Sequence, residues 1–270
     1  MLSADAKTNQ RIFALMQRVL IVDVQPASSK LLSGILRDIC SCQIWTAGDT
    51  TRAMTVAQGI EPHVIFVDHG PSLDGAAFTR AIRRSELQCR HSPVIMLSFQ
   101  ATAAAIIGAR DSGVHEFLRK PFTIKDLVRR LEAVSTRPRD WIEGIGYIGP
   151  DRRRFNSGEY SGALKRRVDH AATPDEARFV QALKILKAAI AAMDTDPRQA
   201  LRAMVAQARE LLGSVRAQAD AELRDMAAAL GQRLVLVDVK ALPKAELRSL
   251  AAPLLAYLPR EAAAQSRPAA

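Results

Sequence analysis

Cysteine is scarce in this 270-residue chain, which holds only Cys40, Cys42 and Cys89. Three cysteines do not form the disulfide framework of a small secreted domain. The pair Cys40 and Cys42 also lacks further ligands at the spacing of a zinc site. We therefore interpret all three residues as free thiols.

Long apolar runs are also missing, although 48% of the residues are hydrophobic. The longest runs contain a handful of residues, whereas roughly 20 are needed to cross a bilayer. Residues 1–13 contain an early acid and no apolar segment, so we expect no signal peptide. These features predict a cytoplasmic protein with no membrane span and a packed core.

Acidic residues are in the minority, because 38 Lys and Arg stand against 28 Asp and Glu, for a net charge of +10. This balance permits contact with nucleic acid, acidic proteins or anionic lipid, and it does not choose among them.

Residues 18–136 alternate between strand-like and helix-like patterns. Most of the strand candidates are short apolar runs, typical of strands buried on both faces. The candidates are Val19–Val22, Gln43–Thr46, Val64–Val67, Val94–Leu97 and Glu116–Arg119. Helical patterns follow them at Ser28–Ile39, Thr50–Gln58, Gly75–Arg84, Ala101–Asp111 and from Thr123 onward. Five such repeats predict an α/β fold with a doubly wound parallel sheet that helices cover on both sides.

Four polar residues stand at the ends of predicted strands, namely Asp23, Asp68, Ser98 and Lys120. In a doubly wound sheet the ligand site lies beyond the carboxyl ends of the strands. The carboxylate of Asp68 could attack a phosphoryl donor and form an acyl phosphate. Nearby acids would hold a divalent cation, usually Mg²⁺, while Lys120 and Ser98 would stabilise the phosphoryl oxygens.

The segments "VLIVD", "VIFVDHGPSLDG", "PVIMLS" and "FLRKPFT" carry these residues in order. Together they resemble the CheY-like receiver domain of two-component response regulators. The resemblance implies a flavodoxin-like, five-stranded sheet with strand order 2-1-3-4-5. It implies that Asp68 is the phosphoacceptor, that Lys120 binds the phosphoryl group and that Ser98 and Phe117 form the switch.

The resemblance also implies an Mg²⁺ site formed by Asp23, Asp68 and the carbonyl group of Gly70. The family usually has a second acid after the first strand, and that position holds Val24 here. The loop after Asp68 is also one residue shorter than usual, with Pro71 in third place, which would displace the Gly70 carbonyl. Losing one carboxylate should weaken a water-rich Mg²⁺ site without necessarily abolishing it.

The remaining chain divides by composition. Residues 137–172 are rich in Gly, Pro and Arg, which predicts a basic linker or irregular extension. Residues 1–17 are interpreted as an N-terminal extension and residues 261–270 as a disordered tail. In the linker, Arg152, Arg153 and Arg154 could bind phosphate groups through bidentate hydrogen bonds, although most charge runs are solvated surface.

Residues 173–260 return to helical periodicity. Thr173 begins a capping box, Asp196 and Pro197 begin a second helix, and Lys244–Tyr257 is the last predicted helix. We predict a mostly α-helical C-terminal domain of unclear family, folded as a small bundle. In one alternative this bundle pairs with a second copy of the chain.

One helix in this half, "AQARELLGSV", has a short likeness to histidine phosphotransfer domains. Arg209 stands where their reactive histidine would be, and all five histidines of the chain lie at or before His170. This half therefore cannot relay phosphate through a histidine, which leaves a docking-only relative or a generic bundle.

Our expectation is a response regulator that is not an enzyme. It would accept phosphate on Asp68 from a histidine kinase or a histidine phosphotransfer protein and signal through protein contacts. No helix-turn-helix pattern appears in residues 171–270, so we expect no DNA-binding output. Two alternatives stay open, a phosphate-independent adaptor with a receiver fold, and a nucleotide or nucleic-acid binder that uses the arginine-rich linker.

Overall fold

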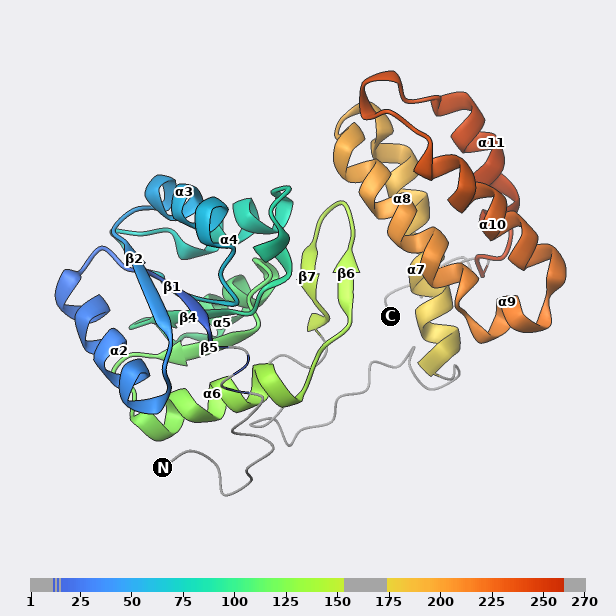
Figure 1. The fold of residues 1–270 in the computed structure, drawn as a ribbon. Coiled ribbons are helices and arrows are strands. Elements are labelled where there is room, and N and C mark those ends of the chain that lie inside the picture. The colour runs from blue at the N-terminus through green and yellow to red at the C-terminus, as the bar shows by residue number, and fades with distance from the viewer. Residues whose placement is uncertain (1–11, 13, 15, 153–173, 260–270) are drawn as a thin grey trace, which may run out of the picture. The chain divides into compact units, whose positions relative to one another are not determined.

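A computed structural model describes residues 12, 14, 16–152 and 174–259 and divides them into two compact units (Figure 1). The first unit holds the described residues up to Ile142, together with residues 147–152. The second unit holds Glu143–Gly146 and residues 174–259.

The first unit is built on a parallel sheet of order β2-β1-β3-β4-β5. Its strands are β1 (Arg18–Val22), β2 (Gln43–Ala47), β3 (Val64–Asp68), β4 (Val94–Ser98) and β5 (Glu116–Arg119). Neighbours run parallel throughout, with Val19 opposite both Ile44 and Val64. The predicted doubly wound sheet and its strand order are confirmed.

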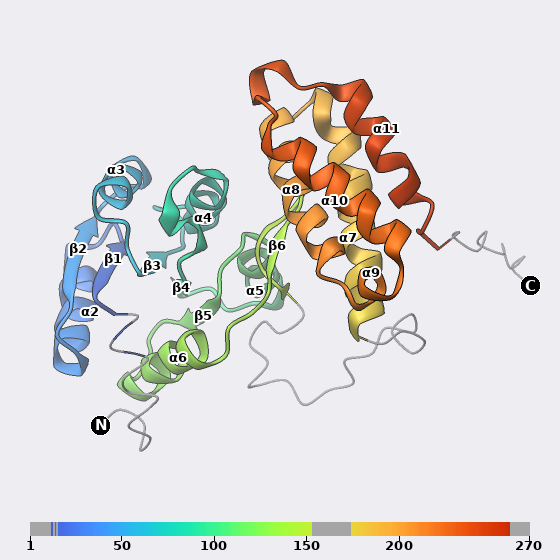
Figure 2. The ribbon, with the colours of Figure 1, turned by 45° about the vertical axis from the view of Figure 1, so that its right-hand side comes forward.

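Helices cover both faces of this sheet (Figures 1 and 2). They are α2 (Pro26–Ile39), α3 (Thr50–Ile60), α4 (Gly75–Arg84), α5 (Ala103–Asp111) and α6 (Ile124–Thr136), with a short 3-10 helix η1 (Gln88–His91). Successive strand residues belong to different cores, because their side chains alternate between the faces. One core joins the sheet to α2 and α6, and the other joins it to α3, α4 and α5.

Part of the predicted N-terminal extension packs against the first unit. Ile12 and Met16 are fully buried in the core that contains α2 and α6. Burial of a large apolar side chain contributes about 1.5–3 kcal/mol, so these two residues belong to the folded unit.

The predicted irregular linker contains regular structure at its start. Strands β6 (Trp141–Glu143) and β7 (Ile148–Pro150) form a two-stranded sheet, and the Tyr147 hydroxyl donates to the Pro150 carbonyl at 2.6 Å. A Cβ on Gly149, whose φ is 152°, would lie 2.8 Å from the Cα of Gly113. The structure therefore contains a hairpin where the sequence predicts a linker or irregular extension.

The fully buried Arg83 sits beside the start of this hairpin. Its guanidinium donates to the carbonyl groups of Gly113, Arg90 and Ser92 and lies 5.3 Å from the ring centroid of Trp141. Burial lowers the pKa of Arg83 to about 9. A buried arginine is tolerated here because carbonyl oxygens accept its hydrogen bonds.

The second unit is helical, as predicted. It contains α7 (Pro174–Ala191), η3 (Ala192–Asp194), α8 (Pro197–Leu212), α9 (Val215–Ala219), α10 (Ala221–Val235), η4 (Val239–Ala241) and α11 (Lys244–Leu255). Asp196 caps α8 through the backbone N–H of Gln199, which confirms the predicted start of that helix. The predicted cap at Thr173 lies outside the described residues.

Two buried glutamines join the helices of this unit to its short N-terminal segment. Gln199 donates to the Glu143 carboxylate at 2.9 Å and to the Gly144 carbonyl at 3.0 Å, and Gln207 donates to the Glu143 carbonyl. Among the described residues, no helix is long and apolar enough to cross a membrane.

Gly75, the first residue of α4, lies against the end of β3. A Cβ at this position would be 2.3 Å from the Asp68 carbonyl oxygen and 3.0 Å from Cγ2 of Val67. Gly75→Ala should therefore lower the free energy of unfolding of the first unit by about 1–3 kcal/mol, the usual cost of overpacking. Urea unfolding followed by tryptophan fluorescence measures this unit, since Trp45 and Trp141 both belong to it.

The matched control is Gly34→Ala on the exposed side of α2, where nothing lies within 4 Å of the added Cβ. Helix propensity predicts a gain of up to about 1 kcal/mol there. Equal losses in the two variants would contradict the close approach of α4 to β3.

Candidate functional site

The carboxyl ends of the strands bring the predicted residues to one edge of the sheet. Asp68 and Ser98 are the last residues of β3 and β4, while Asp23 and Lys120 follow directly after β1 and β5. Parallel strands end on the same side, so four segments far apart in the sequence meet there. Lys120 is in direct contact with both Asp23 and Asp68.

Lys120 lies between the two carboxylates. Its Nζ is 2.6 Å from Oδ1 of Asp68 and 3.0 Å from Oδ2 of Asp23. It also donates to the Ser28 hydroxyl oxygen at 3.2 Å. The lysine is 8% exposed, and a buried ammonium group requires such partners.

Asp23 is held on both of its oxygens. Oδ1 accepts the backbone N–H of Gln25 at 2.8 Å, and Oδ2 accepts the hydroxyl of Ser28 at 2.6 Å in addition to Lys120. Ser28 is a site residue that the sequence reasoning missed. A serine in the first turn of a helix is ordinary, and only its contacts with Asp23 and Lys120 identify it.

Asp68 is more accessible than Asp23, with 19% of its side chain exposed against 2%. Lys120 binds Oδ1 of Asp68, and within the described part of the chain no donor is hydrogen-bonded to Oδ2. One carboxylate oxygen of Asp68 is therefore available for attack on an incoming group.

The predicted metal site contains two acids, Asp23 and Asp68, where the family pattern has three. Val24 packs at the edge of the core formed with α3, α4 and α5, and its side chain offers no oxygen. The carbonyl of Gly70 accepts the N–H of Leu73 at 3.3 Å within a small antiparallel bridge. Across the described ranges, no three acids, histidines or cysteines group into a metal site. Mg²⁺ accepts one or two carboxylates with several waters, so the side chains of Asp23 and Asp68 fit such a site.

The two predicted switch residues are both buried. The hydroxyl of Ser98 donates to the carbonyl of His69 at 2.7 Å, directly after Asp68, and accepts the N–H of Gln100. Phe117 is 4% exposed and belongs to the core on the side of α3, α4 and α5.

Phe99 follows Ser98 and was not predicted. It is 72% exposed, and its ring centroid lies 5.6 Å from Lys120 Nζ.

The predicted anion-binding arginines are only partly described. Arg152 forms an ion pair with Asp111 at 3.0 Å, and its guanidinium carbon lies 4.5 Å from the ring centroid of Tyr147. Arg153 and Arg154 lie outside the described residues. Arg152 thus has partners within the first unit, and anion binding by this segment stays a prediction.

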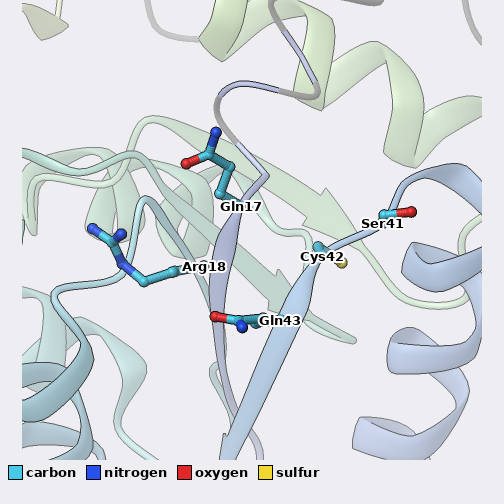
Figure 3. Close-up of a pocket in the computed structure, with 5 residues that line it drawn as sticks. All are labelled: Gln17, Arg18, Ser41, Cys42 and Gln43. Atoms are coloured by element: carbon cyan, nitrogen blue, oxygen red, sulfur yellow. The ribbon is translucent and has the colours of Figure 1, made fainter.

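A separate pocket of about 400 Å³ lies at the amino ends of β1 and β2 (Figure 3). Residues lining it are Gln17, Arg18, Ser41, Cys42 and Gln43. Because it lies at the opposite end of these strands from Asp23, it is not part of the carboxylate site.

Comparison with known proteins identifies the first unit. The family description "Response regulator receiver domain" matches residues 19–132. A probable chemotaxis protein CheY from Rhizobium etli is 34% identical over 118 residues, which are 43% of this chain and 91% of that protein.

Longer regulators match over part of their length. The DNA-binding dual master transcriptional regulator RpaA of Synechocystis is 31% identical over 45% of this chain and 50% of its own. Among solved structures, Vibrio cholerae chemotaxis protein CheY4 is 28% identical over 44% of this chain and 98% of its own, with a TM-score of 0.41.

The matched residues contain all five strands of the sheet and the cluster of Asp23, Asp68, Ser98 and Lys120. The chain therefore belongs to the response regulator receiver family, and its first unit is a receiver domain of the two-component type.

Proposed function

We propose that this protein is a response regulator that accepts a phosphoryl group on Asp68 and transmits the signal through protein contacts. One observation carries the proposal. Asp68 keeps one oxygen accessible while Lys120 holds the other at 2.6 Å, so a nucleophile and a cation for the phosphoryl group stand side by side.

In the reaction, Oδ2 of Asp68 attacks the phosphorus atom of the donor. The bond from phosphorus to the donor's leaving group breaks, and an acyl phosphate forms on Asp68. The leaving group is the imidazole of a phosphohistidine, or acetate when acetyl phosphate is the donor. The partners that present phosphohistidine are a histidine kinase or a histidine phosphotransfer protein.

Lys120 stabilises the product because its ammonium group can donate to a phosphoryl oxygen while keeping its contact with Asp23. Mg²⁺, held by Asp23, Asp68 and the Gly70 carbonyl, would neutralise charge between the nucleophile and the donor. With Val24 in place of an acid, metal affinity and the rate of phosphorylation should be low.

The signal would pass from Asp68 through Ser98. The Ser98 hydroxyl now bonds the His69 carbonyl, and it could turn toward a phosphoryl oxygen on Asp68 at the cost of that bond. The resemblance also assigns Phe117 to the switch. Its side chain is already buried, so Ser98 and the neighbouring face of α5, β5 and α6 carry the change in this proposal.

The output would belong to the helical unit, which has a core of its own. Protein contacts are the proposed output, with a homodimer through these helices as one form of it. A DNA-binding output stays open, since RpaA and the DNA-binding response regulator MtrA are among the relatives.

A second candidate function is a phosphate-independent adaptor in which the receiver is a docking surface. Val24 favours it, because the site has one carboxylate fewer than the family pattern. The double contact of Lys120 also favours it, because one ammonium already offsets part of the charge of Asp23 and Asp68.

Asp68→Asn should abolish labelling of the purified protein by acetyl phosphate, since the amide cannot form an acyl phosphate. The measurement is Mg²⁺-dependent phosphorylation resolved by phosphate-affinity electrophoresis. Asp74→Asn is the matched control, because Asp74 is an exposed N-cap of α4 and asparagine caps a helix equally well. Labelling that survives in Asp68→Asn would refute the site, and no labelling of the unchanged protein would favour the adaptor.

Val24→Asp should strengthen the metal site by restoring the second acid. We expect the Mg²⁺ concentration for half-maximal labelling to fall about tenfold, which corresponds to ~1.4 kcal/mol of binding free energy. Val24→Asn controls for shape and polarity without adding a charge. It should change the Mg²⁺ concentration for half-maximal labelling much less. If both variants label like the unchanged protein, the valine does not limit metal binding.

A further inference from the structure

The hydroxyl group of Ser28 closes a triangle of hydrogen bonds with one acid and the lysine of the carboxylate site. It donates to Oδ2 of Asp23 at 2.6 Å and accepts an N–H of Lys120 at 3.2 Å. Lys120 donates to the same Oδ2 of Asp23 at 3.0 Å. The side chains of Asp23 and Lys120 are only 2% and 8% exposed, so water hardly reaches the triangle and its hydrogen bonds are correspondingly strong.

The sequence after β1 places Ser28 at this point. Pro26 occupies the first position of α2 and fixes the start of the helix, which makes Ser28 the third helical residue. The backbone N–H of Gln25 donates to Oδ1 of Asp23 at 2.8 Å. The turn between β1 and α2 therefore supplies a donor to each oxygen of one carboxylate and fixes how Asp23 lies.

Few positions remain on Asp23 for another partner. Each carboxylate oxygen has about two acceptor sites. Within the described part of the chain, Oδ2 of Asp23 accepts two hydrogen bonds, from Ser28 and Lys120, and Oδ1 accepts one. A divalent cation that approaches Oδ2 therefore has to displace one of these donors.

The Lys120 ammonium group is also fully occupied. It has three N–H donors. Its acceptors among the described residues are Oδ2 of Asp23, Oδ1 of Asp68 and the Ser28 hydroxyl. Of these three bonds, the one to Ser28 is the longest and goes to an uncharged group. The hydroxyl thus takes the donor that neither carboxylate takes, and it keeps the ammonium group beside Asp23.

We propose that Ser28 is a positioning residue that holds Asp23 on Lys120 and thereby lowers the affinity of Asp23 for a divalent cation. The inference rests on the metal-assisted receiver site proposed above and names a residue that regulates it. Val24 removes one charge from this site, whereas Ser28 and Lys120 occupy an oxygen of the charge that remains on Asp23. The valine and the serine therefore act by different routes, weaker attraction and competition for one atom.

The restraint can be released without unfolding α2. Ser28 is half-buried, so its hydroxyl group can bond water once it leaves Asp23. Rotation of one side chain then frees an acceptor site on Oδ2, while the Gln25 backbone still holds Oδ1. The restraint is therefore limited to the strength of one hydrogen bond to a charged group.

Ser28→Ala removes the hydroxyl group and leaves both acids and the lysine in place. The Kd for Mg²⁺ should fall about three- to tenfold, because one hydrogen bond to a charged group no longer competes with the cation. The measurement is titration of the full-length protein with magnesium chloride, without a phosphodonor, followed by the NMR chemical shift of the Gln25 backbone amide. That amide donates to Oδ1 of Asp23 and therefore reports the site.

Two further variants control the result. Ser28→Thr keeps a hydroxyl group at the same position and should retain the Kd of the unchanged protein. Ser33→Ala is the matched control in the same helix, because the Ser33 hydroxyl donates to the carbonyl of Ser29 at 2.7 Å. It should leave the Kd unchanged.

A merely structural role for the hydroxyl group predicts the opposite sign, since a less ordered Asp23 would bind Mg²⁺ more weakly. An unchanged or higher Kd in Ser28→Ala would overturn the proposal, as would an equal fall in Ser28→Thr or Ser33→Ala. Absence of Mg²⁺ binding in both the unchanged protein and Ser28→Ala would overturn it too. Acetyl phosphate labelling separates this inference from the proposed function, because a lower Kd without labelling of Asp68 contradicts phosphorylation and supports the restraint on Asp23.

Discussion

The ammonium group of Lys120 connects the ends of three strands of the receiver sheet. It follows β5, and its two carboxylate partners follow β1 and end β3, at 3.0 and 2.6 Å. Two neighbouring acids at one edge would repel each other without a cation between them, and a buried lysine without an acidic partner would also be unfavourable. The strand order brings these groups together, so that one ammonium group donates hydrogen bonds to both carboxylates.

Val24 changes the charge of this edge rather than its shape. With two acids and one lysine the cluster carries a formal charge of −1, and a second acid after β1 would make it −2. The valine joins the apolar core beside it, so the local fold accommodates it, while one charge fewer should attract a divalent cation less strongly. The receiver fold therefore does not by itself imply efficient phosphorylation.

The sheet, its helices and the residues Asp23, Asp68, Ser98 and Lys120 could be predicted, because strands buried on both faces leave unbroken apolar runs in the sequence. Ser28 could not, since its role depends on contacts across 92 residues. The hairpin β6–β7 could not be predicted for another reason. Its strands have three residues each, too few to show an alternation, and the close packing of Gly149 on Gly113 is a tertiary property.

The receiver match covers the first unit and does not extend to the helical unit. The relatives share the receiver and differ beyond it, since CheY of Rhizobium etli is matched over 91% of its length and RpaA over 50%. An output therefore cannot be inferred from the receiver. The helical unit has its own buried core, with α7, α8, α10 and α11 contributing to it. A unit with its own core can keep its fold while its surface adapts to a partner, so the surface of these helices is where the proposed protein contacts can be tested.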